Sequence, residues 1–373
     1  MDLLLLSLPA IFLIGIFIGY YKRFFYSLLA KLSNNSKYNN YESLKIFLRG
    51  FDPSSLISMN SEKDIEKKRS AVIKYIWKSN KKTEIEFSAQ KNIIDPRYSK
   101  MKNLMGIDKL TTQMKYSINS IAYLFHPLKA KNELIIYHEG HNADFIKSRH
   151  IIQELLSKGY SVLAFSMPLS GMNSKPTIFL NGFGKTKLES KGFLFHNVFQ
   201  YLEAEEFSTL RFFLDPIIAS LNYAEKNFKY SKIYAIGPSG GGWTIMLASA
   251  VDQRIIKSYP IAGSYPLYLR AFGPNTDIGD YEQNIPAFYK IANELELYIL
   301  GSYGKGRKQA QIYNKYDPCC FGGEGVKTYS DPIKKFLAKF GKGSFIFFLD
   351  DTHNGHKISK TALKFVLNDI SKG

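Results

Sequence analysis

The sequence predicts an α/β protein built on a central, mostly parallel sheet with helices on both faces. Short, wholly apolar runs that suit strands buried on both faces alternate with segments of helical spacing. The strands Glu133–His138 and Tyr160–Phe165, with a helix over Asp144–Lys158 between them, predict a right-handed parallel crossover. A chain of 373 residues, 45% of them hydrophobic, can bury one large core and suits one large domain with attachments.

The chain carries a formal net charge of +18, from 50 Lys and Arg residues against 32 Asp and Glu residues. The basic residues are scattered along the sequence, and no nucleic-acid-binding motif accompanies them. We therefore expect no nucleic-acid partner, and attraction to anionic lipid headgroups is the alternative interpretation of the charge. The two cysteines, Cys319 and Cys320, are adjacent and cannot join distant segments. They are expected to be two small buried residues, with a vicinal redox switch as the alternative.

The N-terminal stretch Leu3–Tyr20 is an uncharged apolar run long enough to cross a bilayer as a helix. Asp2 precedes it, and Lys22, Arg23 and Lys31 follow it. The positive-inside rule then predicts a single-pass anchor over residues 1–32, with the bulk of the protein on the cytoplasmic side. The alternative is a signal peptide with an unusual start, which would place the domain outside the cell.

Two further regions follow the N-terminal segment. Residues 33–105 are expected to form a polar linker and a helical extension, with a helix at Ser61–Lys78. Residues 106–373 form the main domain, which opens with two antiparallel strands at Ile107–Tyr116 and Ser120–Phe125. Ser208–Phe228 predicts a helix that starts near Asp215 and Pro216. The intervening residues, about 166–206, have no clean period and are expected to insert as a small cap, in which His196 is structural.

The most informative stretch is Lys232–Ala250, KIYAIGPSGGGWTIMLASA. An apolar strand leads into Gly237-Pro238-Ser239-Gly240-Gly241, and a helix of packed apolar residues follows. Small residues on both sides of Ser239 allow a turn so tight that the serine hydroxyl stands above the sheet edge. The alternative is a glycine-rich turn with an inert serine.

This stretch resembles the nucleophile elbow of the α/β-hydrolase superfamily, nearest to its esterase, lipase and prolyl-oligopeptidase-like branches. The resemblance spans roughly Ile107 to Ile370 and implies the α/β-hydrolase fold with a cap over the active site. It also implies a triad acid after the penultimate strand, Gln309–Tyr313, where Asp317 lies. Asp277 and Asp280 are the alternative acids.

The superfamily places its histidine in the loop after the last strand, here Ser344–Leu349. His356 directly follows Gly355 and matches best, with His353 as the alternative. The chain order Ser239, Asp317, His356 is the order of the superfamily. Because parallel strands end at one edge of a sheet, the three loops should meet there.

Two backbone N–H groups would hold the oxyanion of the intermediate. One belongs to Gly240, the residue after the serine. The other comes from the loop His138-Glu139-Gly140-His141, which departs from the usual His-Gly pattern by inserting Glu139. We expect the donor to be the backbone of Gly140 or His141. The alternative, a metal site at His138 and His141, has a spacing of three rather than the zincin spacing of four.

The resemblance thus implies a serine hydrolase that cleaves a small-molecule or lipid-like carboxylic ester through an acyl-enzyme, with no metal or organic cofactor. An acyltransferase with the same triad is one alternative. A non-catalytic, membrane-anchored binding protein on the same fold is another, because fold does not dictate function. A metal hydrolase that uses His138, His141, His353 and His356 is the third.

Overall fold

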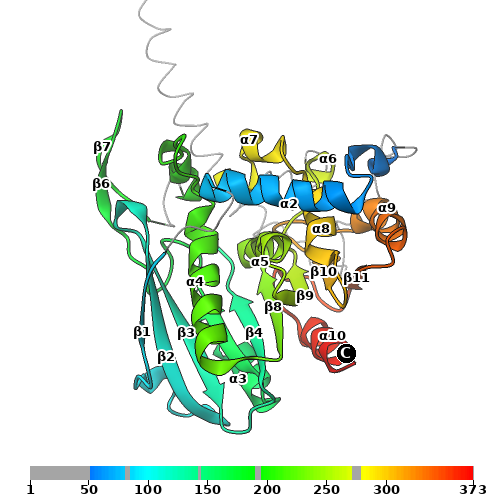
Figure 1. Cartoon of the computed structure of the whole chain (residues 1–373). Helices are drawn as coiled ribbons and strands as arrows, with labels where there is room; N and C mark the ends of the chain where they lie inside the picture. Colours follow the sequence, from blue (N-terminus) through cyan, green and yellow to red (C-terminus); the bar gives the residue numbers. More distant parts are fainter. Residues whose placement is uncertain (1–50, 80–84, 142–143, 190–194, 271–278, 373) are drawn as a thin grey trace, which may run out of the picture. The chain divides into compact units, whose positions relative to one another are not determined.

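The computed structural model describes residues 51–79, 85–141, 144–189, 195–270 and 279–372 (Figure 1). These residues belong to one compact unit. The stretch that the sequence predicts to cross a membrane, Leu3–Tyr20, lies outside the described residues.

A nine-stranded sheet forms the centre of this unit, in the order β1-β2-β3-β5-β4-β8-β9-β10-β11. Its strands are β1 (Glu86–Gln90), β2 (Leu104–Gln113), β3 (Asn119–Pro127), β4 (Glu133–His138), β5 (Ser161–Phe165), β8 (Lys232–Pro238), β9 (Ile255–Ile261), β10 (Lys308–Asn314) and β11 (Ser344–Asp350). β1 to β3 run antiparallel to their neighbours, and the pairs from β5 and β4 through β11 are parallel. The mostly parallel sheet and the opening antiparallel strands are as the sequence predicts.

Helices cover both faces of the sheet (Figure 1). One face packs against α4 (Arg211–Phe228), α5 (Ser239–Val251), α8 (Glu294–Ser302) and α9 (Val326–Ala338), and α2 (Glu62–Trp77) joins the same core by packing against α5. The other packs against α3 (Arg149–Ser157) and α10 (Lys360–Ser371). Side chains of β4 alternate between the two cores, with Leu134 and Ile136 in the first and Ile135 and Tyr137 in the second. Burial from both sides explains why the run Leu134–Tyr137 is apolar at every position.

Short elements complete the described chain. They are η2 (Pro53–Leu56), η3 (Pro96–Tyr98), η4 (Lys115–Ser117), β6 (Thr177–Leu180), β7 (Gly184–Lys187), η5 (Phe195–Tyr201), α6 (Leu267–Arg270), η6 (Tyr281–Gln283) and α7 (Pro286–Tyr289). β6 and β7 form a separate antiparallel hairpin in the region for which the sequence predicts a cap. Its residue Phe179 is 76% exposed.

Two helices begin at other residues than the sequence predicts: α3 begins later and α4 begins earlier. α3 starts at Arg149 rather than Asp144, because residues 144–148 form turns closed by short-range backbone bonds such as Lys147 N to Asp144 O. α4 starts at Arg211, so Pro216 lies inside the helix instead of marking its start. Asp215 is buried and accepts hydrogen bonds from Trp77 Nε1 at 2.8 Å and from Arg211 Nε at 2.9 Å. The tertiary partner Trp77 and the i,i+4 partner Arg211, and not a capping role, explain the aspartate.

The predicted extension, residues 33–105, contributes α2 and β1 to the compact unit. Ser61 starts α2 with a capping box, in which its hydroxyl accepts from the N–H of Asp64. The guanidinium of Arg69 is buried and donates to the carbonyls of Ala250 and Leu300, which lie at the ends of α5 and α8. Arg69 thereby satisfies carbonyls that have no partner within their own helices.

The predicted localisation, a single-pass membrane protein with a cytoplasmic domain, requires correction. Within the part of the chain that the structure describes, no helix combines the length and the apolar composition needed to cross a bilayer. The longest helix there, α4, has 18 residues and includes Arg211, Asp215, Glu225 and Lys226. Since a span needs about 20 consecutive apolar residues, these helices do not supply the predicted anchor.

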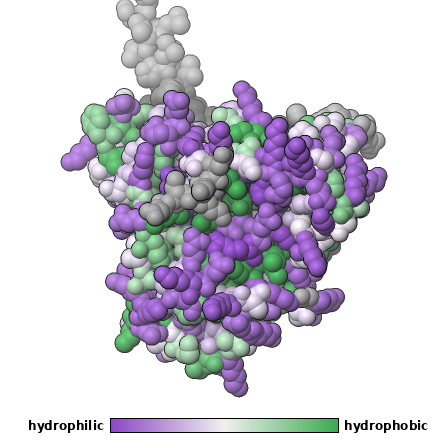
Figure 2. Space-filling model, in the orientation of Figure 1, coloured by the Kyte–Doolittle hydropathy of each residue, from purple (hydrophilic) through white to green (hydrophobic). Residues whose placement is uncertain are grey.

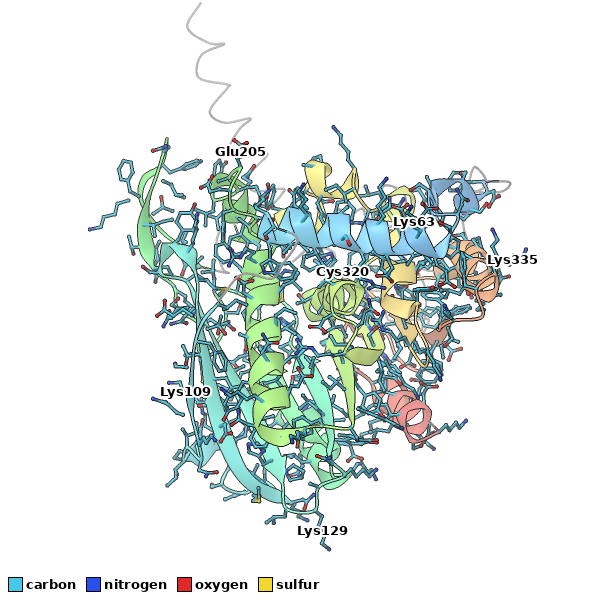
Figure 3. The ribbon with its side chains drawn as sticks, in the orientation of Figure 1. Lys63, Lys109, Lys129, Glu205, Cys320 and Lys335 are labelled. Atoms are coloured by element: carbon cyan, nitrogen blue, oxygen red, sulfur yellow. A yellow bond between two sulfur atoms is a disulfide. The ribbon has the colours of Figure 1, made fainter. Side chains whose placement is uncertain are left out.

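The surface of the described residues is largely hydrophilic on the face shown in Figure 2. Charged side chains point outward from well-separated parts of the molecule, as Lys63, Lys109, Lys129 and Lys335 illustrate (Figure 3). These four lysines belong to different parts of the described chain: Lys63 to α2, Lys109 to β2, Lys129 to the loop after β3, and Lys335 to α9.

Candidate active site

Ser239 stands at the junction between β8 and α5 with a backbone φ of 55°. Side chains with a Cβ rarely adopt this left-handed conformation, and where they do the strain often marks a functional site. The strand before the serine is almost entirely buried, and so is the helix after it, whereas Ser239 itself is partly exposed. The local structure is the strand–turn–helix that the sequence predicts.

The glycines of the elbow are required by close backbone contacts. A Cβ at Gly241 would lie 2.1 Å from the carbonyl oxygen of His138, at the end of the neighbouring strand β4. A Cβ at Gly140, in the loop after β4, would lie 2.9 Å from Ser239 Cβ. The loop after β4 therefore runs directly beside the serine, and only residues without a side chain permit this approach.

Asp317 and His356 are brought together. His356 Nδ1 lies 2.7 Å from Asp317 Oδ2, and the aspartate side chain is fully buried. Because Nδ1 faces a carboxylate, it carries a proton, and the lone pair of the neutral ring is then on Nε2. Nε2 is buried and has no hydrogen-bond partner among the described residues. The structure therefore joins His356 to Asp317, whereas no hydrogen bond joins His356 Nε2 to Ser239.

The carboxylate of Asp317 is fixed by three further donors. The backbone N–H groups of Cys319 and Cys320 donate to Oδ1 at 2.8 and 3.1 Å, and Asn314 Nδ2 donates to Oδ2 at 3.1 Å. Asn314 Nδ2 also donates to the carbonyl of Lys357, at 3.2 Å, and so ties the aspartate loop to the histidine loop. Asn314 ends β10, and nothing in its local sequence signals this role.

Cys319 and Cys320 are joined to each other as a vicinal disulfide. This corrects the expectation of two unlinked buried residues, because the turn after Asp317 brings the two adjacent side chains together. The backbone N–H groups of the same two residues hold the carboxylate of Asp317.

The alternative residues for the acid and the base have other partners. His353 Nε2 lies 3.3 Å from Asp350 Oδ2, and its Nδ1 accepts the N–H of Gly355 at 3.0 Å, so the ring shapes its own loop. Asp280 lies 3.2 Å from His141, away from the His356 pair. Asp277 is outside the described residues.

The sheet places the three predicted residues at one edge. β8, β9 and β10 are neighbours, and β10 pairs in parallel with β11. Ser239 immediately follows β8, Asp317 follows β10, and His356 follows β11. All three therefore lie beyond the carboxyl ends of parallel strands, where α/β sheets usually form their sites.

The backbone donors around Ser239 are not equivalent. Gly240 is the second residue of α5, so its N–H has no acceptor within the helix. The N–H of Gly140 donates to Glu139 Oε1 at 2.9 Å. Of the two donors predicted in the loop after β4, Gly140 is thus already bonded, and His141 is the better candidate.

Glu139, the insertion in the His-Gly pattern, anchors this loop. Its side chain is buried, and Oε2 accepts from Tyr137 Oη at 2.7 Å and from Ser148 Oγ. His138 is buried too: it stacks on Phe165, and its Nδ1 lies 2.9 Å from the Glu139 carbonyl. Burial lowers the pKa of His138 to about 4, so this ring is neutral at physiological pH.

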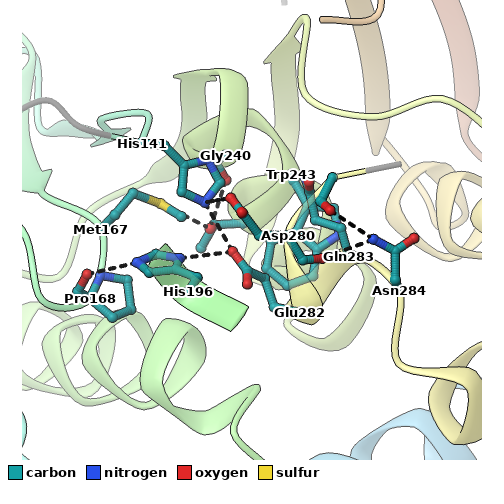
Figure 4. A network of polar contacts seen from close by, with 12 residues as sticks. His141, Met167, Pro168, His196, Gly240, Trp243, Asp280, Glu282, Gln283 and Asn284 are labelled. Carbon is teal, nitrogen blue, oxygen red and sulfur yellow. Dashed lines mark hydrogen bonds and ion pairs between the residues drawn. The ribbon is translucent and has the colours of Figure 1, made fainter. Parts of the chain in front are cut away.

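A second polar network lies against the elbow (Figure 4). The ring of His141 is so close that a Cβ at Gly240 would lie 2.3 Å from its Cε1. His141 Nε2 lies 2.9 Å from Glu282 Oε1 and 3.2 Å from Asp280 Oδ2. His196 Nδ1 lies 2.9 Å from the same Glu282 oxygen. Glu282 belongs to no recognisable sequence motif, so the sequence predicts no role for it.

Glu282 is ionised in this network although it is fully buried. Burial by itself favours the neutral carboxyl, but the attraction of His196 and the hydrogen bonds from both histidines outweigh it and lower the pKa to about 2. Burial likewise opposes the charged form of His196, and the nearby Glu282 carboxylate nevertheless raises the pKa of that histidine.

The metal site considered from the sequence is not formed. Among the described residues, two groups of three or more His, Cys, Asp or Glu side chains converge closely enough to share an ion. One is Cys319, Cys320 and His356, and the other is His141, His196, Asp280 and Glu282. Neither unites His138, His141, His353 and His356, which lie in separate hydrogen-bond networks.

Comparison with solved structures identifies the fold of this chain. No protein-family model and no curated protein matches the chain significantly. Among solved structures, an acetyl xylan esterase from Paenibacillus sp. R4 has a TM-score of 0.51 and 13% sequence identity, over 88% of this chain and 99% of that one. Acetyl xylan esterase 1 from Thermoanaerobacterium sp. JW/SL YS485 has a TM-score of 0.51 and 14% identity, over 88% and 98%.

These similarities, together with the sheet order and the elbow, define the fold. The chain has the α/β-hydrolase fold, as the resemblance of Lys232–Ala250 to the superfamily implies. At identities this low, the neighbours establish the fold and leave the chemistry to be argued from the site.

Proposed function

We propose that this protein is a serine hydrolase that cleaves carboxylic esters, with Ser239 as nucleophile, His356 as base and Asp317 as the acid that orients it. The observation that carries the proposal is the His356–Asp317 pair. It presents a buried, unbonded Nε2 at the sheet edge where Ser239 adopts its left-handed conformation. Such a histidine needs a hydroxyl to deprotonate, and Ser239 is the residue that the elbow raises at that edge.

The chemistry then has two stages. Ser239 Oγ attacks the ester carbonyl while His356 Nε2 takes its proton, and the buried Asp317 stabilises the imidazolium. The same proton passes to the departing alcohol, which leaves an acyl group on Ser239. Water, deprotonated by His356, attacks this acyl-enzyme. The bond from Ser239 Oγ to the acyl carbon then breaks, the carboxylic acid leaves, and His356 returns its proton to Ser239 Oγ.

The N–H of Gly240 and the N–H of His141 are proposed to hold the oxyanion. Gly240 is placed by the first turn of α5, and the loop carrying His141 is anchored by Glu139 and runs beside Ser239. Loss of one such donor typically costs about 3 kcal/mol of transition-state stabilisation. The departure from the His-Gly pattern is thus compatible with a complete oxyanion site.

Two of the structural neighbours are acetyl xylan esterases. We take from them the choice of first substrates: short acyl esters, and acetyl esters in particular. A small acyl group also suits a serine in a confined elbow between the loop after β4 and Met167, whose Cε would lie 2.8 Å from a Cβ at Gly240.

The proposal is tested by intact-mass analysis after incubation with a fluorophosphonate, which forms an adduct only with an activated serine. One adduct is expected on the wild type, none on Ser239→Ala, and slower labelling on His356→Gln. Hydrolysis of p-nitrophenyl acetate should be lost in parallel.

Ser157→Ala is the matched control, because Ser157 is an exposed serine at the end of α3, where the chain returns to the opposite edge of the sheet. It should label at the wild-type rate. Labelling of Ser239→Ala equal to that of the wild type would overturn the proposal.

A further inference from the structure

Four potential metal ligands converge beside the elbow from three separate segments. His141 follows β4, His196 belongs to η5, and Asp280 and Glu282 lie at η6. One ligand atom from each side chain lies within 4.8 Å of the other three. This convergence does not depend on the triad, which uses other residues.

The spacing of the donor atoms fits a small tetrahedral cation. Ligand atoms about 2.0–2.1 Å from a tetrahedral Zn²⁺ lie roughly 3.3 Å from one another. His141 Nε2 is 2.9 Å from Glu282 Oε1 and 3.2 Å from Asp280 Oδ2, and His196 Nδ1 is 2.9 Å from Glu282 Oε1. Small outward movements of these side chains would open the space that the ion needs.

His196 is oriented as metal-bound histidines usually are. Its Nε2 lies 2.9 Å from the carbonyl oxygen of Pro168, an acceptor that requires a proton on Nε2. Nδ1 faces Glu282 Oε1 at 2.9 Å, so in the absence of an ion it also carries a proton, which a bound cation would displace. A histidine that donates one ring N–H to a carbonyl and directs the other nitrogen at the ion is the common outer-shell arrangement of zinc sites.

Glu282 supplies an independent indication of a missing ligand. Its side chain is 0% exposed, and its Oε2 atom has no hydrogen-bond partner among the described residues. A buried carboxylate oxygen without a partner is costly, and native structures rarely leave one. A cation bound to the carboxylate would compensate the negative charge of this buried group, whose Oε1 alone has hydrogen-bond partners among the described residues.

We propose that His141, His196, Asp280 and Glu282 bind one divalent transition-metal cation of the zinc type. Two imidazoles favour such an ion over Mg²⁺ or Ca²⁺, which prefer oxygen ligands alone. Four protein donors close a tetrahedral shell, so the ion is structural and has no open position for a reacting water. The bound ion fixes the ring of His141 against Gly240. A metal at this site would revise the expectation that the protein needs no metal.

The test uses the full-length protein, stripped with a chelator and titrated with Co²⁺, whose visible absorption is strong in tetrahedral sites. One equivalent of Co²⁺ should produce these bands, and Zn²⁺ should displace it. In Glu282→Gln and His196→Gln, affinity should fall by more than the roughly 10- to 100-fold that loss of an outer-shell partner costs. Zn²⁺ should also raise the Tm of the stripped wild type but not of these variants.

Two controls keep the proposal falsifiable. The double variant Cys319→Ser/Cys320→Ser removes the other group of possible ligands and should bind Co²⁺ as the wild type does. Asp280→Asn changes a partly exposed side chain and should weaken binding even if the buried substitutions prevent folding. Absence of tetrahedral bands, a thiolate charge-transfer band, or unchanged affinity in Asp280→Asn would each overturn the proposal. Fluorophosphonate labelling is independent of these readouts.

Discussion

His356 Nδ1 lies 2.7 Å from Asp317 Oδ2, although the two residues are 39 positions apart and follow different strands. Asn314 bonds both the aspartate and the backbone beside the histidine, so the two loops form one hydrogen-bonded unit. Substitutions in this unit, in the elbow beside it, and at the buried residues Asp350 and Arg69 have distinct expected effects.

Asp317→Asn should reduce kcat for short acyl esters by about 10⁴-fold with little change in KM, because an amide can donate to His356 Nδ1 and impose the wrong tautomer. Steady-state kinetics with a matched measurement of Tm would check this. Asp351→Asn is the control, since Asp351 is an exposed neighbour of the histidine loop. A rate near that of the wild type would remove Asp317 from the proposed triad.

Gly240→Ala should lower kcat by about 10²- to 10³-fold, the effect of disturbing one oxyanion donor. The new Cβ would meet the ring of His141 at 2.3 Å, and that ring must move. Since the clash involves the His141 side chain and the proposed donor is its backbone, Gly240→Ala/His141→Ala should recover part of the lost rate. A double-mutant cycle measures the coupling, and strict additivity would contradict this explanation.

Asp350→Asn should make the free energy of unfolding less dependent on pH in the acidic range. Asp350 is fully buried; burial opposes its ionisation, but hydrogen bonds from Ser359 and Thr352 outweigh burial and lower the pKa below its usual value of 3.8. A lowered pKa stabilises the fold above pH 3.8, and that stabilisation is lost as the pH falls through the folded-state pKa.

Urea unfolding at several pH values checks the prediction for Asp350. The stability difference between wild type and variant should be largest near neutral pH and shrink below about pH 4. A difference that stays constant down to pH 2.5 would mean that the carboxylate charge at Asp350 does not matter.

Arg69→Met should lower the free energy of unfolding by about 2–4 kcal/mol, because the carbonyls of Ala250 and Leu300 lose a buried charged donor. Lys67→Met on the same helix is the control, since Lys67 is exposed and should matter little. Equal stability of the two variants would show that α2 is not anchored through Arg69.

Local patterns in the sequence determine much of the architecture. Apolar runs predict β4, β5, β8 and β11 to within a residue or two, because runs of apolar residues are typical of buried strands. β10 is also a strand where the sequence predicts one, although Gln309 and Gln311 are buried in it. The glycines around Ser239 indicate the elbow, because only residues without a side chain fit a turn that close to another backbone. The order of Ser239, Asp317 and His356 follows from the order of the strands.

Tertiary structure alone decides the contacts among residues that no local pattern links. Asp215 and Pro216 suggest a helix start, yet burial against Trp77 and Arg211 places them inside α4. Asn314 and Glu282 have no sequence signature, because their roles depend on partners from distant loops. Sequence periodicity reports which face of an element is buried, whereas hydrogen-bond partners are set by how the elements pack.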